Sequence, residues 1–317
     1  MNKIVFSIFF ICLLVLSGLS FSSVSSEETI RSTGTTLYVD DDGTADYTKI
    51  QDAINASSDG DTVFVYNGTY NGTILINKEI TLEGEDNENT IITGEEDKDV
   101  IDINSNNVLL MKFKIISKGI GNTIELSQSA YSIIENNICI SDVAGILISE
   151  SFNNEISNNF FINNSIGFVQ SDHNDFSENN LERSSLFLAS SNDNIITRNV
   201  IDKINKFGDG ITTSSGSENN LITYNSIKNC NRAVCILSYG FNTISYNDFF
   251  SNKWNAFILN TDCTWHHNYW GRPKILPKII FHMDIIGYYF GFNQYPVYFD
   301  VDWRPALKPN CEDGGVL

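Results

Sequence analysis

Large apolar residues and asparagines recur together along the middle of the chain. Seven segments share one pattern: a large apolar residue, two further residues, an asparagine, one further residue and a second large apolar residue. The segments begin 20 to 26 residues apart, and their asparagines are Asn136, Asn159, Asn179, Asn199, Asn225, Asn247 and Asn268. Five segments carry another asparagine two positions before the first apolar residue, at Asn154, Asn174, Asn194, Asn220 and Asn242. Two asparagine columns therefore follow the repeat.

A second short apolar run follows in six of these repeats, as in Gly145–Ile148 and Ala256–Leu259. The runs are of strand length, contain β-branched and aromatic residues, and are separated by Asn, Ser and Gly without a helical period. Short strands at a fixed period predict an all-β solenoid, in which each repeat buries its apolar residues against its neighbours. Successive coils are then expected about 4.8 Å apart.

The asparagine columns fit the bends between strands. Asparagine tolerates the left-handed backbone conformation of a tight turn, and its amide can bond to the asparagine one coil above and below. Such a ladder also satisfies polar groups that a bend would bury. We therefore expect the seven asparagines to form a structural ladder.

The Asn-x-Ile-x-x-Asn-x-Ile pattern followed by Gly-Ile-x-Leu resembles the right-handed parallel β-helix repeat of pectin-lyase-like folds. It resembles in particular the secreted bacterial and archaeal group that includes NosD-like copper-accessory proteins and carbohydrate-binding or sugar-hydrolase domains. The entry segments 38–43, 47–55 and 60–70 are similar to that group too. The resemblance covers about residues 36–275. We expect a right-handed parallel β-helix of about nine coils over residues 36–271.

Both ends of the predicted solenoid need a cap, because terminal coils expose apolar core and unpaired strand edges. Thr48 with Gln51 forms a capping-box pattern, and Ile50, Ala53 and Ile54 share one face of a helix. We expect this short amphipathic helix to cover the first coil. Residues 272–317 are aromatic-rich, and we expect them to cap the last coil and fold back over the apolar strand face.

The first 26 residues have the layout of a secretory signal peptide. Lys3 precedes the apolar stretch Ile4–Phe21, which a small polar run follows. We favour cleavage over a retained membrane anchor. A second apolar stretch, Ile275–Tyr298, is interrupted by Asp, Gly, Asn and Pro, so we expect no further membrane span. The mature chain is then secreted, at the cell surface or in a periplasm-like space.

Composition sharpens this picture in three respects. The 317 residues include 39 asparagines, far more than surface solvation requires. The formal net charge of −19 disfavours a nucleic-acid partner, because phosphate binding needs clustered Lys and Arg. Five cysteines remain after the signal, at Cys139, Cys230, Cys235, Cys263 and Cys311. Cys230 and Cys235 can be bridged or simply buried, and we favour burial.

Catalytic chemistry is sparse in the repeat. The resemblance implies that family enzymes place acids, Arg or His outward on the strand after the third turn, or on flanking loops. The outward positions expected here are Leu147, Gly167, Phe187, Thr212, Cys235 and Ile258, or in the alternate register Ser149, Val169, Ala189, Ser214, Leu237 and Asn260. Neither register contains Asp, Glu, Lys, Arg or His. The catalytic candidates are therefore loop residues, Asp202, Asp209 and Arg232. Asp209 and Arg232 share a register in adjacent coils, and we favour a surface ion pair over a substrate clamp.

Other candidate sites are isolated. His266 and His267 are the metal-ligand candidates, but neighbours on a strand point to opposite faces, so we expect at most one to join a site. Asp40, Asp42 and Asp46 surround Gly43 and could hold calcium, although a turn is favoured, and no cofactor is predicted. Sequons begin at Asn55, Asn67, Asn71 and Asn163, which are candidate glycosylation sites.

These observations lead to a ranked set of functions. The first is a secreted or cell-surface β-helix that binds an extracellular or envelope polysaccharide without clear catalytic residues. The second is a polysaccharide lyase or hydrolase with a loop-borne site. A structural or adhesive surface protein and a NosD-like periplasmic copper-accessory protein are the remaining alternatives. The fold alone does not choose among them, because one fold hosts many functions.

Overall fold

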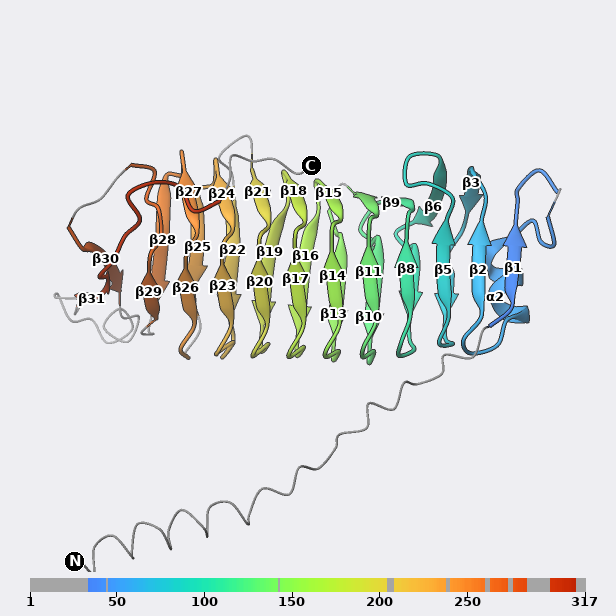
Figure 1. Cartoon of the computed structure of the whole chain (residues 1–317), viewed down its shortest axis with the longest axis horizontal. Helices are drawn as coiled ribbons and strands as arrows, with labels where there is room; N and C mark the ends of the chain where they lie inside the picture. The colour runs from blue at the N-terminus through green and yellow to red at the C-terminus, as the bar shows by residue number, and fades with distance from the viewer. Residues whose placement is uncertain are drawn as a thin grey trace, which may run out of the picture. The chain divides into compact units, whose positions relative to one another are not determined.

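The computed structural model describes residues 34–43, 45–141, 143–203, 208–237, 240–259, 263–272, 276–283 and 297–311. The predicted signal segment 1–26 lies outside them. The described chain is an all-β parallel β-helix of about ten turns, close to the nine expected. Each full coil contributes one strand to each of three sheets, and the coils stack side by side (Figure 1).

Sheets A and C each have eleven strands, and sheet B has nine. Sheet A consists of β1 (Thr36–Val39), β2 (Thr62–Val65), β5 (Thr81–Gly84), β8 (Leu109–Met111), β11 (Ile133–Glu135), β14 (Glu155–Ser157), β17 (Asp175–Ser177), β20 (Ile195–Thr197), β23 (Leu221–Thr223), β26 (Thr243–Ser245) and β29 (Thr264–His266). Sheet B consists of β3 (Gly68–Asn71), β6 (Thr90–Glu96), β9 (Lys114–Lys118), β12 (Ile138–Ile140), β15 (Phe160–Ile162), β18 (Asn180–Glu182), β21 (Val200–Asp202), β24 (Ser226–Lys228) and β27 (Asp248–Phe250).

Sheet C carries the candidate functional site on its outer face. It consists of β4 (Ile74–Ile76), β7 (Ile101–Ile103), β10 (Ile124–Ser127), β13 (Ile146–Ser149), β16 (Ser165–Val169), β19 (Ser185–Ala189), β22 (Asp209–Ser214), β25 (Arg232–Ile236), β28 (Trp254–Leu259), β30 (Lys278–Met283) and β31 (Val297–Asp302). All strand pairs are parallel except β30 with β31. Alternate residues of each strand point inward, where Ile, Leu, Val and Phe form one continuous core.

The helix α2 (Ile50–Ala56) lies at the N-terminal end, as predicted, and buries Ile50, Ala53 and Ile54. The capping-box prediction is wrong, because the helix begins after Lys49 without a side-chain cap. Gln51 instead uses its amide to bond both backbone groups of Leu75, at 2.8 and 3.2 Å. Leu75 lies on β4, the first strand of sheet C, so the helix satisfies an edge that would otherwise be unpaired.

The asparagine ladder is present at the corner between sheets A and B, with one correction. Asn159 accepts hydrogen bonds from the backbone and side-chain nitrogens of Asn137, at 3.0 and 3.1 Å, so the first member is Asn137 and not Asn136. Each ladder amide also donates to a carbonyl of the preceding coil, as Asn159 does to Ile134 at 2.8 Å. From Asn159 to Asn268 the predicted members are all buried.

The backbone reason given for the ladder is wrong. Among the described residues, the left-handed conformation belongs to the residue before each ladder position, including Asn136 (φ 56°), Asn158 (φ 57°) and His267 (φ 58°). The ladder asparagines themselves serve through their side chains. The second asparagine column forms a similar ladder at the corner between sheets C and A, beside a serine column that the sequence analysis missed: Ser129, Ser151, Ser171, Ser191 and Ser217.

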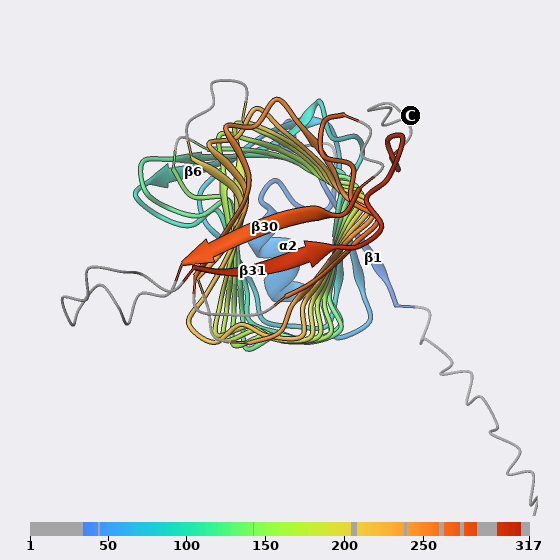
Figure 2. The same ribbon diagram turned by 90° about the vertical axis from the view of Figure 1, so that its left-hand side faces the viewer.

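The two ladders end on carboxylates of the C-terminal segment. Asp300 accepts from the backbone nitrogen of Cys263, which occupies the next position after Asn242 in its column. Asp302 accepts from the backbone and side-chain nitrogens of Asn268, at 3.1 and 3.3 Å. Both acids lie on β31, and the antiparallel pair β30–β31 crosses the C-terminal end of the coils (Figure 2).

The chain after β31 runs back along the corner between sheets A and B. Ala306 donates to the carbonyl of Asn268, and the backbone nitrogens of Asn310 and Cys311 donate to the buried carboxylate of Asp248. These contacts lie away from sheet C, over which we expected the segment to fold. Most of the aromatic residues on which that expectation rested, at 288–295, lie outside the described residues. No helix in the described ranges is long and apolar enough to cross a membrane.

Candidate functional site on the outer face of sheet C

One column of outward positions crosses sheet C from β4 to β28. Strand pairing places Leu75, Asp102, Glu125, Leu147, Gly167, Phe187, Thr212, Cys235 and Phe257 in register. The expected outward position Ile258 is wrong, because Ile258 pairs with inward-facing Ile236 and is 1% exposed. Phe257 takes the outward place. The column also begins earlier than the sequence analysis assumed, and two acids occupy its first part.

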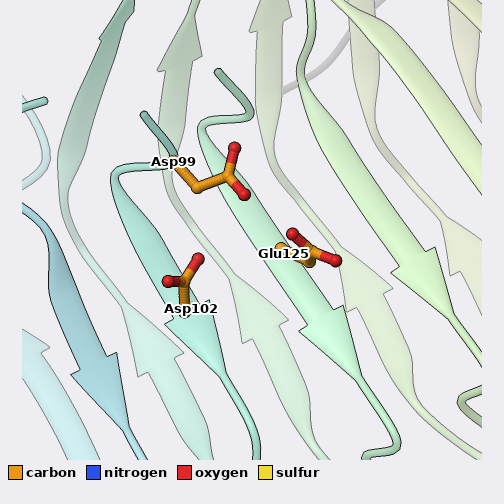
Figure 3. Close-up of side chains that lie close together, drawn as sticks. All are labelled: Asp99, Asp102 and Glu125. Carbon is orange, nitrogen blue, oxygen red and sulfur yellow. The ribbon is translucent and has the colours of Figure 1, made fainter. Parts of the chain in front are cut away.

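Three carboxylates gather on this face. Asp102 on β7 pairs in register with Glu125 on β10, and Asp99 lies just before β7 (Figure 3). One oxygen of each carboxylate lies within 4.8 Å of the others. Asp99 also accepts a hydrogen bond from the backbone nitrogen of Asn122. One buried oxygen of Asp102 has no hydrogen-bond partner among the described residues.

The electrostatics of this carboxylate group favour a shared proton. A hydrogen bond with Asp99, burial, and the charges of Asp99 and Asp102 raise the pKa of Glu125 to about 7. Burial and the charge of Asp99 raise the pKa of Asp102 as well. The group therefore offers a proton donor, Glu125, beside two further carboxyl groups. Its all-oxygen donor set also suits hard cations such as calcium.

Sequence reasoning missed the carboxylate group because it compared outward positions only from Gly145 onward. The signal was present in the alternation of Ile101-Asp-Ile103 and Ile124-Glu-Leu126, where an acid stands between two inward residues. Asp99 carries no such signal. It joins the group only through the path of the loop before β7.

An aromatic ring lies against the backbone of the same face. Gly167 is the one outward position of the column without a side chain, and three ring atoms of Phe187 occupy the space that a Cβ there would need. Further along, the guanidinium of Arg232 lies over the ring of Phe257, 4.9 Å from its centroid. The outer face of sheet C therefore presents carboxylates at one end and aromatic rings toward the other.

The predicted loop candidates are placed on neighbouring coils and each acid already has a cationic partner. Asp209 and Arg232 pair in register, as expected, and form two hydrogen bonds of 2.6 and 2.7 Å. Asp202 lies 3.4 Å from the ammonium of Lys228 and accepts from Asn229 at 2.9 Å. Their catalytic role stays a prediction, and the pairing is that of structural ion pairs.

The two predicted metal ligands meet, against expectation. The Nδ1 atoms of His266 and His267 are 3.2 Å apart. The rule of alternating faces fails here because His267 has a left-handed backbone (φ 58°), which turns its ring toward that of its neighbour. The ring of Tyr246 stacks on His267 and meets His266 edge to face.

The predicted calcium ligands lie in a turn. Asp46 accepts a hydrogen bond from the backbone nitrogen of Tyr38, and Asp40 accepts one from that of Asp42. These acids are not part of the carboxylate group formed by Asp99, Asp102 and Glu125. Among the sequon asparagines, Asn55, Asn67 and Asn71 are exposed, and Asn163 is half-buried. Among the described residues, Cys139, Cys230, Cys235 and Cys311 form no disulfide, and Cys230 and Cys235 are fully buried.

The fold and the site together define a parallel β-helix protein whose sheet C carries carboxylates and aromatic rings on its outer face. Residues 54–287 match the family described as "Periplasmic copper-binding protein (NosD)", and the chain belongs to this family. No curated protein matches the sequence.

Solved structures share the fold. ORF18 of Geobacillus virus E2 has a TM-score of 0.53 at 15% identity, covering 74% of this chain and 57% of the viral one. The catalytic domain of a GH87 α-1,3-glucanase in complex with nigerose has a TM-score of 0.51 at 11% identity, covering 75% of this chain and 56% of its own. The chain thus spans little more than half the length of these proteins. At such identities the likeness shows the fold alone.

The family description names copper, but the described residues supply only some of the ligands that a copper site needs. The single group of three or more His, Cys, Asp or Glu ligands there is the carboxylate group, whose hard oxygens suit other metals. His266 and His267 supply two imidazole nitrogens, which suit copper. The described residues therefore offer a two-nitrogen donor and not a complete protein-ligated centre.

Proposed function

We propose that the protein is exported and binds an extracellular or cell-envelope polysaccharide on the outer face of sheet C. The observation that carries the proposal is the ring of Phe187, which lies over Gly167 in line with the carboxylates. A ring fixed against backbone offers a flat apolar surface to the apolar face of a sugar, at little cost in side-chain entropy. Carboxylate and hydroxyl groups beside it supply hydrogen bonds to sugar hydroxyls.

The regular spacing of the coils also supports a polymeric ligand. The outward column offers one position per coil, about 4.8 Å from the next, along nine of the eleven strands of sheet C. A chain of sugars laid along this face contacts several coils at once. The glucanase domain of the same fold, solved with nigerose, is a precedent for sugar binding on such a scaffold.

Replacing Phe187 by alanine is expected to weaken polysaccharide binding about tenfold, which corresponds to about 1.4 kcal/mol. Gly167→Ala should weaken it similarly, because a methyl group there displaces the ring without removing it. The matched control is Phe152→Ala, which removes a 48% exposed ring from the corner between sheets C and A. Glycan arrays find the ligand, and affinity electrophoresis measures each variant. Equal affinities for all three variants would place the ligand elsewhere, and no binding by the wild type would favour a structural role.

A second candidate function is glycoside hydrolysis by the carboxylate group, favoured by the raised pKa of Glu125. A hydrolase needs one protonated carboxyl to donate a proton to the leaving oxygen and one carboxylate to act as base or nucleophile. Glu125 is half-protonated near pH 7, and Asp102 or Asp99 would be the second carboxyl group of the pair.

Glu125→Gln is expected to lower release of reducing sugars at least about a hundredfold, because an amide cannot donate the proton. Wild-type activity should fall as pH rises above about 7, where Glu125 loses its proton. Glu135→Gln, an outward glutamate on sheet A, is the control and should leave activity unchanged. Binding without any sugar release removes the hydrolase and leaves the binding proposal intact.

A further inference from the structure

We propose that a pocket at the corner between sheets B and C binds a negatively charged sugar residue, one that carries a carboxylate or a sulfate group. The pocket has a volume of about 300 Å³ and lies at the C-terminal end of the solenoid, where β28 pairs with β30. Lys253, Trp254 and Lys278 are among its walls. The inference adds a second site, three strands of sheet C away from Phe187, and rests on the proposed function only in taking a saccharide as the ligand.

The charge of the pocket is opposite to that of the chain as a whole. The full chain has 39 acidic and 20 basic residues, whereas the described residues that line the pocket include Lys253 and Lys278 and no acid. Asp302 lies behind one wall, fully buried, and accepts a hydrogen bond from the indole nitrogen of Trp270 at 3.0 Å. The two ammonium groups therefore favour an anionic group, without a competing carboxylate in the described lining.

Trp254 supplies an apolar surface for the sugar ring itself. It is 57% exposed, and its backbone nitrogen donates to the carbonyl of Asn231 at 2.9 Å, which fixes the start of β28. A large exposed indole beside polar side chains can pack against the C–H face of a sugar, while the polar groups bond to its substituents. A simple inorganic anion would leave this ring unused, so the pocket suits a charged saccharide better.

The polar walls are held in place before any ligand binds. The Lys278 ammonium lies over the ring of Trp270, 5.8 Å from its centroid, and the Trp270 ring is 5% exposed. Asn252 donates to the carbonyl of Ile227 at 2.9 Å and to the side-chain oxygen of Asn255 at 3.3 Å. The NH₂ group of Asn255 thus remains as a donor for a sugar hydroxyl. Fixed partners of this kind lower the entropy cost of binding.

The test is titration calorimetry of the full chain with three tetrasaccharides. Unsulfated chondroitin carries carboxylates, sulfated chondroitin carries sulfates as well, and N-acetylated chitotetraose is neutral. We expect at least one charged tetrasaccharide to bind at least about tenfold more tightly than the neutral one, and the difference to shrink at high salt. Similar affinities for the two chondroitins would identify the carboxylate as the group that is bound, and much tighter binding of the sulfated one would identify the sulfate.

Variants assign the binding to this pocket. Trp254→Ala should weaken the charged tetrasaccharide at least about tenfold. Lys253→Gln and Lys278→Gln should each weaken it about fivefold and leave the neutral one unchanged, whereas Lys278→Arg should keep the preference for charge. The matched controls are Phe152→Ala and Lys118→Gln, which remove an exposed ring and an exposed lysine on other coils and should bind as the wild type does.

Circular dichroism checks that each variant folds. The inference is overturned if the wild type binds neither charged tetrasaccharide, if it binds charged and neutral ones within twofold of each other, or if Trp254→Ala and both Gln variants bind within twofold of the wild type. Inorganic sulfate that competes as well as the tetrasaccharide would also overturn it. Phe187→Ala should leave this binding unchanged, so a chain that binds the charged tetrasaccharide here but no polysaccharide on sheet C removes the proposed function and leaves this inference standing.

Discussion

Replacing Asp302 by asparagine is expected to destabilise the C-terminal end of the solenoid by about 4 kcal/mol. The Asp302 carboxylate is fully buried and accepts five hydrogen bonds, from the backbone nitrogens of His267, Asn268 and Arg304 and from the side chains of Asn268 and Trp270. An asparagine must point its NH₂ group at some of these donors, and each hydrogen bond to a buried charge contributes about 1.5–3 kcal/mol. The asparagine ladder then loses its terminal acceptor.

The loss of stability should affect the C-terminal coils before the rest of the solenoid, because each coil contacts only its neighbours. Native-state hydrogen exchange is expected to show lost protection in β26 and β29 while β11 and β14 keep theirs. Asp193→Asn is the control: its side chain is 44% exposed, and its effect should stay within about 0.5 kcal/mol. Uniform loss of protection along the chain, or none, would show that Asp302 does not terminate the ladder.

Asn159→Ala is expected to cost about 3 kcal/mol and to weaken the solenoid at its middle. The Asn159 side chain accepts from both nitrogens of Asn137 and donates to Ile134, Ser157 and Asn179. Alanine leaves these groups buried and unsatisfied in its own coil and in the coils on either side, at about 1–3 kcal/mol for each group before relaxation.

The neighbouring asparagine gives a matched control. Asn158 is exposed and has a left-handed backbone (φ 57°), which glycine adopts without strain. Asn158→Gly should therefore leave the denaturation midpoint nearly unchanged, while Asn159→Ala lowers it and broadens the transition. Similar midpoints for the two variants would contradict the division of roles between the paired asparagines.

Paired asparagines also show where sequence reasoning reached its limit. Asn136 and Asn137 both fit the repeat loosely, and the sequence pattern selected the wrong one because Ile133 and Ile134 are equally apolar. Strand pairing decides the register by aligning Ile134 with Ile156, both of which are fully buried. A one-residue shift reverses which side chains face the core, so only the stacked coils settle it.

Charge shows a similar division. Residues 34–150 contain 21 acidic and 6 basic side chains, whereas residues 151–317 contain 16 and 12. The acidity is therefore concentrated in residues 34–150. The structure places Asp99, Asp102 and Glu125 of that range together on sheet C, which composition alone does not reveal.

The sequence by itself determined the β-helix, because each repeat carries its own strand pattern and its own asparagine, and stacking is the way to bury both. It also determined that Asp209 and Arg232 are neighbours, since register follows the repeat. Only the tertiary structure decided the carboxylate group, the Phe187 ring over Gly167 and the meeting of His266 with His267. These depend on loop paths, on contacts between coils and on a left-handed residue, and local patterns in one chain do not encode such geometry.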